Sequence, residues 1–181
     1  SGLKTADGET PYSTTGLVAQ WNFNEASGTT AVSGGTCGTS CNGTLTSFAS
    51  TGSRDAAIMS GWTANNRRWG AGALMFDGVD DSVSSSTTPT LGTCSFSIES
   101  WIKVAKSGAN MRIVSYGGST TNTGVTFSVN TSNQLQASLT NTAGPHSDKT
   151  VNDGNWHHAV LVNNAGTFQI YVDGSASGAA V

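Results

Sequence analysis

The sequence predicts an all-β protein, built as an antiparallel two-sheet sandwich or jelly roll. Strand-like segments follow one another about every 10 residues and are separated by turn residues, which is typical of such sandwiches. Within these segments apolar residues alternate with polar ones, as they do in a strand with one buried face. No window has a convincing 3.6-residue period, so strands rather than helices are expected to form the core.

The clearest element is a β-hairpin within residues 152–174. Both of its strands alternate with a period of two. Residues 163–166, Asn-Asn-Ala-Gly, form the predicted loop, because Asn and Gly adopt positive φ angles at low cost. Asp173-Gly174 marks the following turn. One face of the first strand carries Trp156, His158, Val160 and Val162, and the other carries His157, Ala159 and Leu161.

Other strands are predicted on the same grounds. The strongest is FSIESWIKV at residues 96–104, whose two faces differ clearly in polarity. Its apolar face carries Phe96, Ile98, Ile102 and Val104, and its other face carries Glu99, Trp101 and Lys103. The remaining predicted strands are residues 17–23, 44–48, 73–76, 79–84, 111–116, 124–130 and 134–140.

The chain is expected to consist of an extended arm or linker at residues 1–15 and one domain at 16–181, which is long enough for a substantial core. Only 10% of the 181 residues are charged, and the net charge is −3 without a Lys/Arg cluster. A nucleic-acid partner is therefore not expected. No apolar run approaches the roughly 18–20 residues that cross a bilayer, so this segment is not expected to insert into a membrane.

Two of the three cysteines, Cys37 and Cys41, are four residues apart in a Gly/Ser/Thr-rich loop. Without a nearby His or a second Cys pair they are a poor zinc site, and a local disulfide fits better. Such a bridge implies an oxidising compartment. Cys94 is left over, either as a buried small apolar residue or as a partner for another chain.

The order of these motifs resembles the laminin G-like (LamG-like) jelly rolls of the concanavalin A-like lectin/glucanase superfamily. The resemblance rests on GLVAQWNFNEASGTTA (16–31), CNGTL (41–45), WGAGALMFDGVDDSV (69–83), FSIESWIKV (96–104), NDGNWHHAVLV (152–162) and FQIYVDG (168–174). It implies two antiparallel sheets packed face to face. It also implies an extracellular or cell-surface module that recognises carbohydrates or proteins.

The resemblance further implies a structural calcium ion at one rim of the sandwich. Asp80 and Asp81 match the acidic stretch that supplies its ligands in the family, whereas Asp77-Gly78 is interpreted as a plain turn. Ser33 stands where the family has another Asp. Since calcium takes six to eight oxygen ligands, the alternative is that the bridge between Cys37 and Cys41 rigidifies this loop in place of the metal.

LamG-like domains usually continue past this hairpin with a final strand, and this chain ends at Val181. Two alternatives follow: the sequence is a truncated form of the domain, or the closing strand is supplied from elsewhere. In either case the sheet by itself is expected to present an open edge. An open edge is a template for pairing with another chain. Residues 1–15 are a candidate donor strand, and self-association through this edge is one expected interaction.

No catalytic site is expected. Related glucanases carry Glu-x-Asp-x-x-Glu on one strand, because glycoside hydrolysis needs two carboxylates. Here Glu99 is followed by Trp101 and Val104 at the corresponding positions. The chain has no GxSxG motif. His157 and His158 project to opposite faces of one strand, so they cannot ligate one metal together.

The best local candidate for a saccharide site lies in the irregular stretch 49–72, because sugar sites combine exposed aromatic faces with amides. The cluster consists of Trp62, Asn65, Asn66, Arg67 and Trp69. The alternative is that these tryptophans only fix the loop onto the sandwich, while Trp21 and Trp156 are predicted to lie in the core. The expected function is non-catalytic recognition of carbohydrate or protein outside the cell. The alternative is a structural subunit of a surface appendage or filament.

Overall fold

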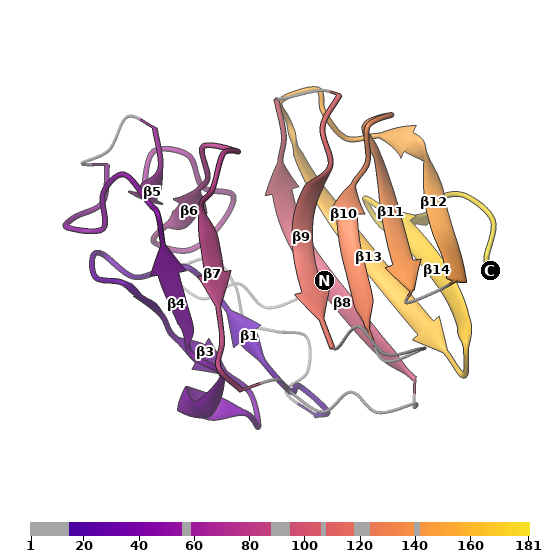
Figure 1. Ribbon diagram of the computed structural model, residues 1–181, viewed down its shortest axis with the longest axis horizontal. Helices are drawn as coiled ribbons and strands as arrows, with labels where there is room; N and C mark the ends of the chain where they lie inside the picture. Colours follow the sequence, from indigo (N-terminus) through magenta and orange to yellow (C-terminus); the bar gives the residue numbers. More distant parts are fainter. Residues whose placement is uncertain (1–14, 56–58, 88–94, 106–107, 118–123, 140–141) are drawn as a thin grey trace. The chain divides into compact units, whose positions relative to one another are not determined.

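The computed structural model describes residues 15–55, 59–87, 95–105, 108–117, 124–139 and 142–181 (Figure 1). These residues fall into two compact units, Ser1–Pro89 and Thr90–Val181. The predicted arm, apart from Thr15, and Cys94 lie outside the described residues. Antiparallel strands dominate both units, as the sequence predicts. None of the described helices has the length and hydropathy of a membrane span.

The N-terminal unit consists of short strands in three small antiparallel sheets. These pair β1 (Gln20–Trp21) with β3 (Ser33–Gly34), β2 (Thr30–Ala31) with β4 (Gly43–Thr46) and then β7 (Ser82–Ser84), and β5 (Gly61–Thr63) with β6 (Ala73–Met75). Three buried side chains form its core, namely Ala31, Leu45 and Trp62. Trp21, which the sequence assigns to the core, is half-buried and packs against them.

The predicted disulfide joins Cys37 and Cys41 around a 3₁₀-helix, η1 (Gly38–Cys41), with 5.6 Å between their Cα atoms. The indole N–H of Trp21 donates to the carbonyl oxygen of Cys41 at 3.0 Å. The backbone N–H of Ser33 donates to Oδ1 of Asn42 at 2.9 Å. The bridge and these hydrogen bonds together tie the loop to the first strands.

The C-terminal unit contains two four-stranded antiparallel sheets (Figure 1). One has the order β12 (Thr142–Thr150), β11 (Gln134–Leu139), β10 (Val125–Val129), β9 (Met111–Tyr116). The other has the order β15 (Ser175–Ala176), β14 (Thr167–Val172), β13 (Trp156–Asn164), β8 (Phe96–Lys103). This unit therefore contains most of the regular sheet.

Buried apolar side chains from both sheets of this unit form one core cluster. It consists of Val125, Phe127, Val129, Leu135, Ala137, Val151, Ala159, Leu161, Phe168, Ile170 and Val172. The apolar face of β8 packs against it as predicted, through Phe96, Ile98 and Ile102. Trp156 was predicted to be in the core but is only half-buried, because it shares the β13 face opposite to Ala159 and Leu161.

The connection between β13 and β14 is shorter than the predicted four-residue loop. Asn163 pairs with Phe168 and Asn164 with Thr167, so only Ala165 and Gly166 form the turn. Both turn residues have positive φ, 50° and 96°. Positive φ at both central positions defines the type I′ turn, whose twist matches that of the flanking strands. The two asparagines therefore extend the strands.

The strand β12 was not predicted, because it lacks an apolar alternation and contains Gly144 and Pro145. Proline is confined to edge strands and bulges, and β12 is an edge strand whose register with β11 shifts twice. A Cβ atom at Gly144 would overlap the carbonyl oxygen of Ala137 on β11. Gly144 and Pro145 therefore make β12 hard to recognise from the sequence, and both are compatible with an irregular edge strand.

The chain's C-terminal residues follow β14 on its outer side. After β15, the N–H of Ser177 donates to the carbonyl oxygen of Ile170 at 3.0 Å. Phe168 and Val181 exchange two backbone hydrogen bonds of 2.7 and 3.0 Å. The edge of β14 is therefore paired with residues 175–181.

Candidate functional site

The aromatic cluster predicted as a ligand site is not assembled as expected. Trp62 lies in β5 with only 1% of its surface exposed, and its indole N–H donates to the carbonyl oxygen of Gly28 at 2.8 Å. A buried indole presents no face to a ligand. Trp62 is therefore removed from the predicted site, and the alternative that it fixes this segment to the core applies to it.

The other members of that cluster lie on a surface loop that Asp55 organises. The carboxylate of Asp55 accepts hydrogen bonds from the Thr63 hydroxyl at 2.7 Å and from the N–H of Ala64 at 3.0 Å. The hydrogen bond from Thr63, together with those from the backbone N–H groups of Asn65 and Ala64, holds the pKa of Asp55 below its ordinary value. The residues Asn65, Asn66 and Arg67 are exposed, and Trp69 is half-buried with the guanidinium of Arg68 4.2 Å from its ring centroid. Ligand binding by these four residues stays a prediction.

The predicted metal ligands lie in a tight acidic group with a third member. Carboxylate oxygens of Asp77, Asp80 and Asp81 lie within 4.8 Å of one another. Two of these residues also shape the loop, since Asp81 accepts the N–H of Asp77 at 2.7 Å and the hydroxyl of Ser60 at 3.2 Å. Three carboxylates are the hard oxygen ligands that calcium takes, so the donor set fits the predicted ion.

A groove that was not predicted from the sequence lies on the outer face of the β9–β12 sheet, the face turned away from the core cluster. This groove has a volume of about 380 Å³. Its lining consists of Asn110, Arg112, Thr126, Ser128, Gln136 and Ser138. Strand alternation explains the arrangement, because the neighbours Phe127, Val129 and Leu135 point into the core.

Strand register sets the polar side chains of the groove in cross-strand rows. Ser128 pairs with Arg112 on β9 and with Gln136 on β11, so these three form one row. Thr126 pairs with Ser115 and with Ser138, which form a second row. Directly opposed residues project to the same face of a sheet. Three strands thus bring together side chains that are up to 26 positions apart in the sequence.

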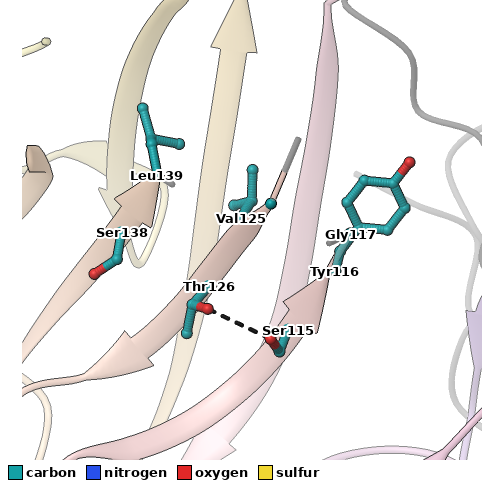
Figure 2. A pocket seen from close by; sticks show the side chains of 8 residues that line it. Ser115, Tyr116, Gly117, Val125, Thr126, Ser138 and Leu139 are labelled. Carbon is teal, nitrogen blue, oxygen red and sulfur yellow. Dashed lines mark hydrogen bonds between the residues drawn. The ribbon is translucent and has the colours of Figure 1, made fainter. Parts of the chain in front are cut away.

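A smaller hollow of about 170 Å³ adjoins the groove at the end of the sheet and shares Thr126 and Ser138 with it. Figure 2 shows Thr126 and Ser115 side by side, joined by a hydroxyl–hydroxyl hydrogen bond of 3.4 Å. Val125 and Leu139 point to the opposite side. The polar surface therefore continues from the groove to this end of the sheet.

The groove offers unused hydrogen-bonding groups. Among the described residues, the side chains of Asn110, Arg112 and Gln136 have no hydrogen-bond partner. Arg112 is exposed and is the only charged residue in the strands β9, β10 and β11. Polar residues on alternate strand positions look like ordinary solvent-facing ones, so the one available signal was this single charge.

The two strand histidines have structural partners. Nδ1 of His157 lies 2.9 Å from Asp173 and Nε2 lies 3.0 Å from Asp153. The ring of His158 stacks on Trp101 with 5.0 Å between centroids, and its Nε2 lies 3.6 Å from Glu99. The two rings therefore contact different partners.

The chain was also compared with known proteins. The model of the family described as the concanavalin A-like lectin/glucanases superfamily matches residues 77–181, which is more than half of the chain. No curated protein has a significant match to the sequence.

Among solved structures, the chain is similar to the crystal structure of an S-layer domain-containing protein (residues 221–444) from Clostridium thermocellum ATCC 27405. The TM-score is 0.52 at 19% sequence identity, and the match covers 90% of this chain and 71% of that chain. At this identity the likeness shows a shared fold. The family match carries the assignment, and the chain belongs to the concanavalin A-like lectin/glucanases superfamily.

Proposed function

We propose that this chain is a non-catalytic recognition module that binds a saccharide in the groove on the outer face of β9, β10 and β11. The observation that carries the proposal is the lining of the groove. It offers hydroxyl, amide and guanidinium groups, and none of its described residues is acidic.

The chemistry of the lining suits a sugar. Ser, Thr, Asn and Gln side chains both donate and accept hydrogen bonds, and sugar hydroxyls do the same. The side chains of Asn110 and Gln136 have this capacity unused toward the described residues. Glycoside hydrolysis needs a pair of carboxylates about 5–10 Å apart, which the described lining does not supply. Binding without cleavage is the activity that this surface supports.

The disulfide and the family support a location outside the cell. The Cys37–Cys41 disulfide is of the kind that persists in oxidising compartments. The superfamily contains lectins by its description.

The test is affinity electrophoresis of the chain against a panel of neutral and acidic polysaccharides, with one variant at each candidate site. Gln136→Ala removes an unpartnered amide from the groove, and Asn65→Ala removes an exposed amide from the predicted loop cluster. Loss of retardation only with Gln136→Ala is the expected result. Loss only with Asn65→Ala moves the site to the loop, and no retardation by any polysaccharide refutes saccharide binding.

We further propose that Asp77, Asp80 and Asp81 hold a structural calcium ion. The support is the close approach of their carboxylates, which lie within 4.8 Å of one another. Three like charges at this separation repel one another in the absence of a cation. A bound ion would remove that repulsion and fix the loop between β6 and β7.

A second candidate function is a subunit of a cell-surface layer or filament. The similar solved structure comes from an S-layer domain-containing protein, which motivates this candidate. The strand β8 stands at one end of its sheet order, and strand edges are sites of chain pairing. Light scattering over a wide concentration range, with electron microscopy of the same sample, tests it. Ordered assemblies support the candidate, and a monomer at all concentrations refutes it.

A further inference from the structure

We propose that the groove selects an acidic saccharide and that Arg112 binds the carboxylate of a uronic acid unit. This inference rests on the proposed function, because it specifies the substrate class of the same groove. It predicts that a carboxylate, rather than sugar hydroxyls alone, decides which saccharide binds.

The charge of the groove favours an anionic ligand. The strands β9, β10 and β11 contain one charged residue, Arg112, and none of the other described lining residues is charged. The chain as a whole has a net charge of −3. The groove is therefore a local positive site on a protein with a weak negative charge, and such a site attracts anionic ligands.

Within the part of the chain that the structure describes, no group neutralises this charge. Among the described residues, the guanidinium of Arg112 has neither an ion pair nor a hydrogen bond. Its side chain is exposed on the outer face. By contrast, the guanidinium groups of Arg54 and Arg67 donate to backbone carbonyl oxygens. None of the described residues therefore occupies a donor position of Arg112 that a ligand could use.

The geometry of Arg112 and its row fits a sugar that carries a carboxylate. A guanidinium presents a planar pair of N–H groups that matches the two oxygens of a carboxylate. Ser128 and Gln136 continue the same row across the sheet, with strands roughly 5 Å apart. When the carboxylate of a uronic acid unit binds Arg112, its sugar ring and the next sugar unit would lie over the hydroxyl of Ser128 and the amide of Gln136. The row combines one anionic subsite with adjoining neutral ones.

The experiment compares matched ligands by calorimetry, in the presence of a chelator so that cations do not crosslink the polymers. The acidic probes are oligomers of galacturonate, mannuronate and glucuronate. Each is paired with its methyl ester, which keeps the sugar and masks the carboxylate. Neutral dextran and dextran sulfate complete the set. Wild type is expected to bind at least one uronate, with affinity about tenfold or more lower for its ester.

The variants assign the effect to Arg112. Arg112→Gln is expected to reduce uronate affinity to that of the ester. Arg112→Lys keeps the charge but loses the planar fork, so it should retain only part of the affinity. Lys103→Gln removes an equal charge from β8, in the other sheet, and is the control that should bind like wild type.

The outcomes separate this inference from the proposed function. Equal binding of uronates and their esters, or an effect of Lys103→Gln as large as that of Arg112→Gln, refutes the acidic selection while the saccharide groove stands. Dextran sulfate binding as tightly as the uronates overturns the carboxylate assignment in favour of general polyanion binding. Failure of every saccharide to bind refutes the proposed function itself.

Discussion

At the scale of single residues, His157 connects three parts of the C-terminal unit. Its imidazole contacts Asp153 before β13 and Asp173 in the turn after β14. Asp173 also accepts the backbone N–H of His158 at 2.9 Å. Partial burial lowers the pKa of His157, but the two carboxylates outweigh burial, so the pKa is raised above its ordinary 6.5.

The pKa values of the two carboxylates, Asp153 and Asp173, are lowered. Hydrogen bonds from the N–H and side chain of Asn155, and from His157, lower the pKa of Asp153 from 3.8 to about 2. Burial raises the pKa of Asp173, but the bonds from His157 and His158 outweigh it and the pKa is lowered. The three groups are therefore most stabilising when the imidazole is protonated and both carboxylates are ionised.

This pairing predicts a pH dependence of stability. The contribution of His157 to the free energy of unfolding is complete below pH 6.5 and is lost as the pH rises through the raised pKa of the imidazole. The contribution of the carboxylates is complete above pH 3.8 and is lost as the pH falls, for Asp153 toward about 2. Urea unfolding is expected to show higher stability at pH 5 than at pH 8.

The matched variants for this prediction are His157→Gln and His146→Gln. The first should flatten the profile between pH 5 and pH 8, because the titrating ring is gone. The second should keep the wild-type profile, since His146 is exposed and has no ion pair within the described residues. Equal profiles for wild type and His157→Gln would contradict the account.

At the scale of elements, the docking of the C-terminal segment depends on a close backbone approach. A Cβ atom at Gly178 would overlap the carbonyl oxygen of His146 on β12, and the φ angle there is +80°. Gly174 has the same φ angle but no atom within 4 Å of its Cβ position. The two glycines therefore separate the effect of backbone conformation from that of close packing.

Replacing Gly174 or Gly178 by alanine should lower the free energy of unfolding by different amounts. Gly174→Ala is expected to lower the free energy of unfolding by about 1–2 kcal/mol, the conformational penalty alone. Gly178→Ala should carry the same conformational penalty and a further loss of about 1–3 kcal/mol, because the new Cβ atom would push the C-terminal segment away from β12. Denaturant unfolding measures both values. Equal losses would show that residues 177–181 do not pack against β12 as described.

The disulfide and the proposed calcium ion are both expected to stabilise loops of the N-terminal unit, and removing each gives a further prediction. Reducing the Cys37–Cys41 bridge should lower Tm, because closing so short a loop stabilises by about 2 kcal/mol. A chelator should also lower Tm if calcium binds the acidic group, and calcium should restore it. Asp80→Asn should remove the response to the chelator. Differential scanning calorimetry distinguishes the two, and an unchanged Tm with chelator refutes the calcium proposal.

At the scale of the whole molecule, strands with strong alternation could be predicted and those without it could not. The strands β8, β13 and β14 were predicted to within two residues because one face of each is apolar. The strand β12 carries Gly144 and Pro145 at an edge and has no such pattern. Trp62 was misplaced because all three residues of β5 are buried, so no alternation marks that strand.

The candidate site escaped prediction for a different physical reason. Arg112, Ser128 and Gln136 are ordinary outward residues in three separate strands, and only the register sets them in one row. Register depends on turn geometry and on packing of the opposite face. The acidic group was partly predicted because Asp77, Asp80 and Asp81 are close in sequence as well as in space.

Saccharide binding in the groove is tested most directly by an NMR titration of the 181-residue chain with the best-binding saccharide, followed through its backbone amides. Chemical-shift changes are expected to concentrate in β9, β10 and β11, around Arg112, Thr126 and Gln136. Changes confined to residues 65–69 or to the acidic group, with β9–β11 unperturbed, would contradict saccharide binding in the groove.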